Sequence, residues 1–164
     1  MTILELNALE AAAFVTQLEA IFEQSPWVAE RVVNERPFES RANLHVAMCA
    51  AMRSAPLEQQ LELIRAHPEL AARATMTPDS VSEQRGAGLD RLTPNEHAAL
   101  LRLNRAYRER FGFPFILAVK GKDKNDIRAA FEERVKNDLE TEFQTALSEI
   151  EKIAGFRLEA LIEN

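Results

Sequence analysis

Apolar residues recur every three or four positions along most of the chain. An early stripe contains Phe14, Leu18 and Ile21, and a late one extends from Phe143 to Leu161. Residues at this spacing lie on one face of an α-helix, so each stripe predicts an amphipathic helix with one buried face. These stripes, separated by proline and glycine, predict about eight helices.

Capping residues mark where several of these helices begin. Thr93-Pro94-Asn95-Glu96 combines an N-cap, a first-turn proline and a capping-box glutamate, and predicts a helix that ends at Gly112. Asn7 with Glu10 resembles a second capping box, and Asn125 predicts a further N-cap. His67-Pro68 predicts a helix break, because the residue before proline is disfavoured in the α region.

Two stretches do not fit a helix. Residues 113–119 are apolar, short and contain a proline, so they predict an extended segment, yet no second strand is available to pair with it. Its backbone groups must bond either to helix ends and water or to a ligand. Residues 75–91 form the only long polar connection, and long ordered loops often carry function.

Composition supports one all-α domain over residues 1–164. The chain has 46% hydrophobic and 28% charged residues, which is typical of a globular protein large enough to bury a core. Alanine, leucine and glutamate are plentiful, and these residues lose little side-chain freedom in a helix.

Charge and targeting signals narrow the function. A net charge of -6 argues against nucleic acid as a partner. No apolar run approaches the roughly 18 to 20 residues of a membrane span, and the N-terminal region carries Glu5 and Glu10 rather than a signal peptide. We therefore expect a cytoplasmic protein. The single Cys49 has apolar neighbours and is expected to be a small hydrophobe rather than a nucleophile.

The three histidines are the first candidates for chemistry. None pairs with another at the spacing of metal ligands, so no metal is expected, and because the glycines do not form a phosphate-binding loop, no cofactor is expected either. His45 and His97 are expected to be structural or solvated. His67 stands at a helix break, where an imidazole with an ordinary pKa of about 6.5 suits proton transfer near neutral pH, although packing or capping would also explain it.

Two further groups have both a structural and a chemical interpretation. The stretch from Ser80 to Leu89 gathers a hydroxyl, the Glu83 carboxylate and the Gln84 carboxamide; it is either a capped turn ending in glycine or part of a site. Arg157 lies in an otherwise apolar stretch, so it either extends to the surface or binds an anion inside.

Several motifs occur together in a fixed order. They are His-Pro-Glu-Leu-Ala (67–71), Ser-x-x-Glu-Gln (80–84) with Ala-Gly-Leu (87–89), Leu-Asn-x-x-Tyr-x-x-x-Phe-Gly-Phe-Pro-Phe-Ile (103–116) and Arg-x-x-Asn-Asp-x-x-x-Glu (134–142). With Ser-Pro-Trp-Val-Ala-Glu (25–30) and Arg-Pro-Phe (36–38), the chain resembles the 2-oxo-4-hydroxy-4-carboxy-5-ureidoimidazoline (OHCU) decarboxylase family over nearly its whole length.

The resemblance implies an all-α lyase without a cofactor, which removes CO2 from OHCU and yields (S)-allantoin during urate degradation. It places the catalytic histidine on His67 and its partner carboxylate on Glu83. Substrate-binding positions fall on Pro68, Ser80, Gln84, Phe115, Ile116 and Arg157, with Arg157 expected to bind the substrate carboxylate and Phe115-Ile116 to contact the ring through the backbone. His67 would either deprotonate the ring hydroxyl or protonate the intermediate.

One departure and two alternatives remain. The connection from His67 to Ser80 is a few residues shorter than the usual family pattern, which affects the shape of the loop more than the chemistry. A same-scaffold enzyme could act on another product of purine breakdown, or the chain could be a non-catalytic helical interaction module. The resemblance and the apolar content favour a homodimer that acts on a small ureide.

Overall fold

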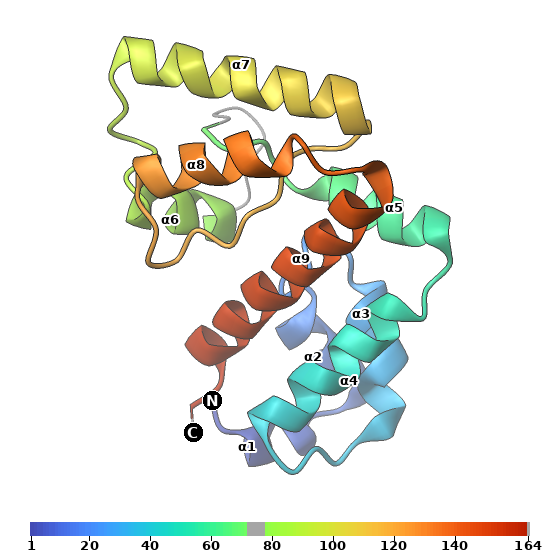
Figure 1. The fold of residues 1–164 in the computed structure, drawn as a ribbon. Coiled ribbons are helices and arrows are strands. Elements are labelled where there is room, and N and C mark those ends of the chain that lie inside the picture. Colours follow the sequence, from blue (N-terminus) through green and yellow to red (C-terminus); the bar gives the residue numbers. More distant parts are fainter. Residues whose placement is uncertain (72–77, 164) are drawn as a thin grey trace. The chain divides into compact units, whose positions relative to one another are not determined.

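The computed structural model describes residues 1–71 and 78–163, and these ranges are dominated by α-helices (Figure 1). They contain nine α-helices and one short 3-10 helix, with no β-strand. The prediction of an all-α fold with about eight helices is confirmed. None of the helices in the described ranges is long and apolar enough to cross a membrane.

The chain divides into two compact units. The first unit comprises Met1–Ala66 and Ile150–Asn164, and the second comprises His67–Glu149. Up to Ala66 the helices are α1 (Ile3–Asn7), α2 (Ala11–Leu18), α3 (Trp27–Val32), η1 (Val33–Glu35), α4 (Arg41–Arg53) and α5 (Leu57–Ala66). They are followed by α6 (Pro78–Gly86), α7 (Pro94–Phe111), α8 (Lys124–Arg134) and α9 (Leu139–Leu161), whose residues belong partly to each unit. That residues 1–164 form a single domain stays a prediction.

The first unit buries the apolar stripes that its sequence predicts. Helix α3 packs against both α2 and α4. Ser40 caps α4, since its Oγ accepts a hydrogen bond from the Asn43 N–H at 3.1 Å. The largest fully buried side chains of this unit are Leu6, Phe14, Leu18, Phe22, Leu44, Met48, Met52 and Leu63.

Helix α7 begins and ends as the sequence predicts. The Thr93 hydroxyl accepts from the Glu96 N–H at 3.2 Å, and the Glu96 carboxylate accepts from the Thr93 N–H at 3.1 Å. Gly112 ends the helix with a φ of 77°, in the left-handed region that glycine tolerates best. Helix α8 packs against α7 (Figure 1).

The prediction of a capping box at Asn7 and Glu10 is wrong. The N-terminal capping box is Thr2–Glu5, which starts α1, and Asn7 is the last residue of that helix. The Asn7 carboxamide instead binds the backbone of Phe38 twice: its Nδ2 donates to the carbonyl at 2.8 Å and its Oδ1 accepts from the N–H at 2.9 Å. Helix α2 has no side-chain cap at Glu10.

The N-cap predicted at Asn125 lies two residues too late. Asp123 caps α8, because its Oδ1 accepts from the N–H groups of Asn125 and Asp126, both at 2.9 Å. Asp126 returns a hydrogen bond to the Asp123 N–H at 3.0 Å. The first turn of α8 contains several residues that favour caps, so composition alone did not fix the boundary.

The polar connection predicted over 75–91 is largely wrong, because α6 occupies 78–86. The sequence of α6 is mostly polar, so few apolar positions indicate the buried face of a helix. Residues 75–77, and the shape expected for the shortened connection after His67, lie outside the described residues.

The extended segment predicted at 113–119 is confirmed. The segment follows α7 and precedes α8 in the chain. Residues 114–119 have no regular secondary structure, and all seven residues from 113 to 119 are buried. No strand pairs with it in the described ranges.

Candidate functional site

His67 lies directly after α5, in a turn that comprises residues 67–71. Helix α5 ends at Ala66, as the His67-Pro68 sequence predicts. The His67 side chain is buried, with 7% of its surface exposed, and Pro68 is half-buried. A buried imidazole on a proline-restricted turn has little freedom to change its orientation.

Two side chains from neighbouring helices hold the end of this turn. Gln84 of α6 accepts a hydrogen bond at its Oε1 from the Ala71 N–H at 2.7 Å. Asn104 of α7 donates from its Nδ2 to the Leu70 carbonyl at 2.9 Å. Both hydrogen bonds are buried, where leaving such a backbone group unsatisfied would be costly.

The middle of the turn is anchored on the surface. Arg108 of α7 donates from its Nε to the Glu69 carboxylate at 2.7 Å. Ala71 has a φ of 64°, a left-handed conformation that costs an alanine roughly 1 to 2 kcal/mol. Contacts at three successive residues, Glu69, Leu70 and Ala71, therefore hold the turn in a conformation that the chain does not prefer by itself.

Helix α6 carries three of the residues that the sequence singled out. Ser80 and Gln84 are four residues apart, so they share one helix face, and both are buried. Glu83 is half-buried on the adjacent face. The Gln84–Ala71 hydrogen bond joins the helix that bears Ser80, Glu83 and Gln84 to the turn that bears His67.

Phe115 and Ile116 lie in the buried 113–119 segment, among aromatic rings. Phe115 stacks on Phe131 with centroids 3.7 Å apart, and Tyr107 meets Phe115 edge-on at 5.2 Å. Tyr107 also contacts Phe111 at 4.6 Å and Phe113 at 6.1 Å. This cluster fixes the side chains of the segment from α7 and α8.

A buried polar network lies beside the same segment. Arg134 donates from its Nη1 to the Ile116 carbonyl at 2.5 Å and from its Nε to Glu142 Oε1 at 2.6 Å. Tyr107 donates its hydroxyl to the same Glu142 oxygen at 2.6 Å, and Asn137 donates to Oε2 at 3.1 Å. No sequence pattern predicted a role for Tyr107, Arg134, Asn137 or Glu142, although the Arg-x-x-Asn-Asp-x-x-x-Glu motif contains three of them.

The surroundings of Tyr107 keep its phenol neutral. Burial raises the pKa of Tyr107 well above its usual range, and the hydrogen bond to Glu142 raises it further. Tyr107 is therefore a hydrogen-bond donor to the Glu142 carboxylate at any physiological pH.

Arg157 lies in the first unit, on α9, and is buried with 8% of its surface exposed. Of its two interpretations, extension to the surface is therefore wrong. Its Nη1 donates to the Ala20 carbonyl at 2.9 Å, and its Nη2 donates to Glu23 Oε2 at 2.8 Å. Glu23 is buried too, so the guanidinium is held by an internal carboxylate.

The other candidates of the sequence analysis have structural explanations. His45 is half-buried and bonds through Nε2 to the Glu151 carbonyl at 2.8 Å, which agrees with a satisfied structural histidine. Burial, and secondarily the charge of Glu151, raises the pKa of Cys49 to about 12, so the thiol is a poor nucleophile. Within the described ranges, no group of three His, Cys, Asp or Glu side chains could hold a metal ion.

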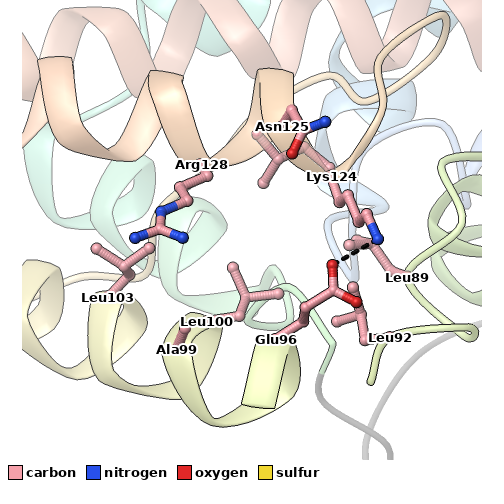
Figure 2. Close-up of a pocket in the computed structure, with 10 residues that line it drawn as sticks. Leu89, Leu92, Glu96, Ala99, Leu100, Leu103, Lys124, Asn125 and Arg128 are labelled. Carbon is pink, nitrogen blue, oxygen red and sulfur yellow. Dashed lines mark ion pairs between the residues drawn. The ribbon is translucent and has the colours of Figure 1, made fainter. Parts of the chain in front are cut away.

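A pocket between α7 and α8 contains none of the predicted site residues. Figure 2 shows an ion pair between Lys124 and Glu96, whose charged atoms are 2.5 Å apart, and four leucines around the pocket: Leu89, Leu92, Leu100 and Leu103. The cavity has a volume of about 60 Å³. Small-molecule sites commonly measure about 300 to 1,000 Å³, so this pocket is too small to enclose a ureide.

Known proteins are similar to this chain in sequence and in fold. The OHCU decarboxylase family model matches residues 7–159. The uric acid degradation bifunctional protein of Bacillus subtilis is 48% identical over 96% of this chain, which spans 32% of that protein. The 2-oxo-4-hydroxy-4-carboxy-5-ureidoimidazoline decarboxylase of Haloferax volcanii is 47% identical, with 96% of this chain and 94% of that protein covered.

A solved structure agrees with the sequence comparisons. The crystal structure of (S)-allantoin synthase is 34% identical and superposes with a TM-score of 0.83, covering 99% of this chain and 54% of that one. The all-α fold and the family model thus indicate the same class of protein. The chain belongs to the OHCU decarboxylase family.

Proposed function

We propose that this chain converts OHCU into (S)-allantoin and CO2 during urate degradation, without a cofactor. The family match over residues 7–159 carries this proposal. It is supported by the Haloferax volcanii relative, which bears the name of this decarboxylase and which the chain spans almost completely.

The chemistry requires little beyond positioning. The bond between the ring carbon and the carboxylate breaks, its electron pair moves into the adjacent ring imine, and CO2 leaves. The electron pair leaves a double bond between this carbon and its ureido-bearing neighbour. The neighbour then takes up a proton while the ring hydroxyl loses its own and becomes a carbonyl, so no oxidant or reductant is consumed. The protein must hold the carboxylate, stabilise charge that develops on the ring and deliver the proton to one face.

His67 is the residue that moves this proton. The observation that supports this role is the turn of residues 67–71. Contacts at Glu69, Leu70 and Ala71 hold the turn, so the buried imidazole is presented from a fixed position. Glu83, on the helix that Gln84 joins to this turn, orients His67 and stabilises its charged form. Pro68 restricts the same turn and forms part of the wall that contacts the substrate.

Ser80, Gln84 and the Phe115–Ile116 backbone contact the ring and its ureido group. Ser80 and Gln84 share the buried face of α6, where a hydroxyl and a carboxamide can each donate a hydrogen bond. Gln84 uses its Oε1 for the Ala71 N–H, which leaves its Nε2 as the atom suited to an acceptor on the substrate. Residues 115 and 116 are buried outside any helix, so their backbone groups are not committed to a helical ladder.

Arg157 binds the substrate carboxylate. A guanidinium matches a carboxylate with two parallel N–H groups, and it remains charged at all relevant pH values. The Ala20 carbonyl and the Glu23 carboxylate set the plane of this guanidinium within the first unit. The fork is thereby oriented before substrate arrives, which reduces the entropy lost on binding.

The finer assignments rest on the sequence. We propose that the enzyme is cytoplasmic and acts as a homodimer. Light scattering during size-exclusion chromatography tests the dimer: a mass near twice 18.5 kDa supports it, and a mass near 18.5 kDa contradicts it.

The decisive experiment adds the purified protein to freshly oxidised urate and follows CO2 release and optical activity together. Spontaneous decay gives a racemic product, so faster CO2 release with a growing circular dichroism signal supports the proposal. His97→Asn serves as a control for histidine replacement, because His97 is half-buried at the start of α7 and has no proposed role. Turnover at the spontaneous rate, or a racemic product, contradicts it.

A further inference from the structure

Arg134, the last residue of α8, connects a buried carboxylate to the backbone of the 113–119 segment. Its guanidinium donates to the Ile116 carbonyl through Nη1 and to Glu142 through Nε. Arg134 is 7% exposed and Glu142 is fully buried. The guanidinium therefore lies between one charged group and one backbone group, both shielded from water.

We propose that Arg134, held by Glu142, is a positioning residue that fixes the Ile116–Leu117 peptide group for contact with the substrate. This inference rests on the proposed function, because it assumes that the backbone near Ile116 contacts the substrate ring. It adds a structural cause for that contact: a charged pair that does not itself touch the substrate.

The Glu142 carboxylate is fixed by side chains from two other helices and from the turn after α8. Tyr107 of α7 and Arg134 of α8 both donate to Oε1 at 2.6 Å, and Asn137 donates to Oε2 at 3.1 Å. Glu142 itself lies in the first turn of α9. A carboxylate with these partners has one orientation, so the guanidinium that it binds also has one.

The face of the guanidinium is fixed as well. The Arg134 guanidinium carbon lies 4.3 Å from the centre of the Phe115 ring, in a cation–π contact. Phe115 in turn stacks on Phe131 at 3.7 Å. Arg134 thus contacts two successive residues of the segment, the Phe115 side chain and the Ile116 carbonyl.

Peptide geometry carries this constraint to the opposite side of the segment. The Ile116–Leu117 peptide is trans and planar, so its C=O and N–H groups point in opposite directions. Fixing the Ile116 carbonyl on Arg134 therefore also fixes the direction of the Leu117 N–H, away from Arg134. Preorganised N–H donors of this kind stabilise charge that develops on a substrate.

Because Arg134 and Glu142 are a buried ion pair, their role is better explained by positioning the backbone than by stabilising the fold. Burying a guanidinium and a carboxylate costs desolvation that apolar residues of similar volume avoid. Replacing both residues by apolar ones often leaves a protein equally stable, whereas removing one partner leaves an uncompensated charge. Replacing both residues together therefore separates an effect on positioning from an effect on folding.

The test compares the double variant Arg134→Met/Glu142→Met with wild type and with Tyr107→Phe. The double variant removes both charges and the donor to Ile116, while approximate volume is kept. We expect kcat to fall about 10- to 100-fold, because small misplacements of a contact group have effects of that order. The unfolding temperature should fall moderately, because Tyr107 and Asn137 lose the acceptor for their hydrogen bonds. Tyr107→Phe keeps Arg134 but loosens Glu142, so we expect a smaller loss of about 3- to 10-fold.

Arg53→Met/Glu151→Met is the matched control, because Arg53 and Glu151 form an ion pair at 2.7 Å within the first unit. It should retain kcat and KM. A double variant that is folded at the assay temperature and keeps kcat within about twofold overturns the inference. If that variant does not fold, Tyr107→Phe decides: unchanged kcat overturns the inference, and the expected loss supports it. An inactive wild type would instead contradict the proposed function, so the two failures are distinguishable.

Discussion

Gln84 accepts a hydrogen bond from the Ala71 N–H at 2.7 Å, and this contact links α6 to the turn that carries His67. The bond joins residues thirteen positions apart and is buried. Any shift of α6 therefore acts on the turn, and Glu83, one residue before Gln84, is placed by the same contact. Gln84 thus has a positioning role in addition to the substrate contact that we propose for it.

We predict that Gln84→Ala lowers both stability and activity. The substitution leaves the Ala71 N–H buried without its acceptor, which should reduce the free energy of unfolding by about 1 to 3 kcal/mol. Because the turn loses an anchor, kcat/KM should fall about tenfold or more. Urea denaturation and steady-state kinetics measure the two effects.

Gln60→Ala is the matched control for this prediction. Gln60 is also buried, and its Nε2 donates to the carbonyls of Met52 and Arg53 at the end of α4. Its removal should lower the free energy of unfolding while kcat/KM stays near wild type. Equal losses of activity in both variants would attribute the effect of Gln84→Ala to general destabilisation.

We predict that Arg157→Lys weakens substrate use far more than a conservative substitution normally would. Lysine offers a point charge in place of a planar fork, so both the grip on the substrate carboxylate and its orientation suffer. We expect kcat/KM to fall about 10- to 100-fold. Arg53→Lys replaces another ion-paired arginine of the first unit and should remain near wild type.

A second measurement separates binding from structure at Arg157. The same substitution disturbs the bonds to Ala20 and Glu23, so thermal unfolding should be recorded alongside kinetics. Reduced stability with kcat/KM within about twofold of wild type would make Arg157 a structural residue only.

The sequence predicted most helices because their signals are local. Thr93 to Glu96 holds a complete capping box, and Gly112 adopts the positive φ expected of a helix stop. Asn7 failed for a reason that no local pattern contains: its carboxamide binds Phe38, thirty-one residues away. Helix α6 was not predicted because its exposed face is polar and its buried face is formed by two polar residues, Ser80 and Gln84.

The candidate site likewise contains residues that local signals predict and residues that only the fold brings together. His67 stood out because a histidine before proline is a local signal, and the motifs around it gave the family. The network of Tyr107, Arg134 and Glu142 could not be assembled from spacing, since Tyr107 and Glu142 are thirty-five residues apart. Likewise, nothing near Arg157 in the sequence indicates that Glu23, 134 residues away, is its partner.

We predict that Tyr107 produces a loss of stability at alkaline pH. The unfolded phenol ionises near pH 10, whereas the folded phenol keeps its proton because burial and Glu142 raise its pKa. Below about pH 10 both states hold the proton and this group contributes no pH dependence. Above it the unfolded state binds fewer protons, so stability falls as pH rises, by up to about 1.4 kcal/mol per pH unit.

Tyrosinate absorbance measures this directly, because Tyr107 is the only tyrosine in the sequence. The folded protein should show no ionisation where the urea-unfolded protein titrates near pH 10, and Tyr107→Phe should lose this part of the alkaline slope. A folded-state titration near pH 10 would show that the phenol reaches solvent.

We predict that turnover survives dialysis against a strong chelator. The ring of OHCU accepts the electron pair of the breaking bond, so the reaction requires no metal ion as an electron sink. Rates before and after dialysis should agree within error. A loss of activity that added zinc or manganese restores would contradict the prediction.

The final prediction treats His67 and Glu83 as one unit. Proton transfer by a single side chain is typically worth about 10² to 10⁴ in rate, so His67→Asn should remove most of the acceleration over the spontaneous decay of OHCU. Glu83→Gln keeps the shape of the side chain but removes the charge that orients His67, and it should lose less.

The double variant decides whether the two residues share one task. If Glu83 acts only through His67, then His67→Asn/Glu83→Gln should be little slower than His67→Asn alone, because partners in one function are not additive. The measurement is OHCU decay above background for wild type, both single variants and the double variant, with His97→Asn as the control. Losses that multiply would assign Glu83 a separate role, and a near-normal rate in His67→Asn would remove His67 from the centre of the mechanism.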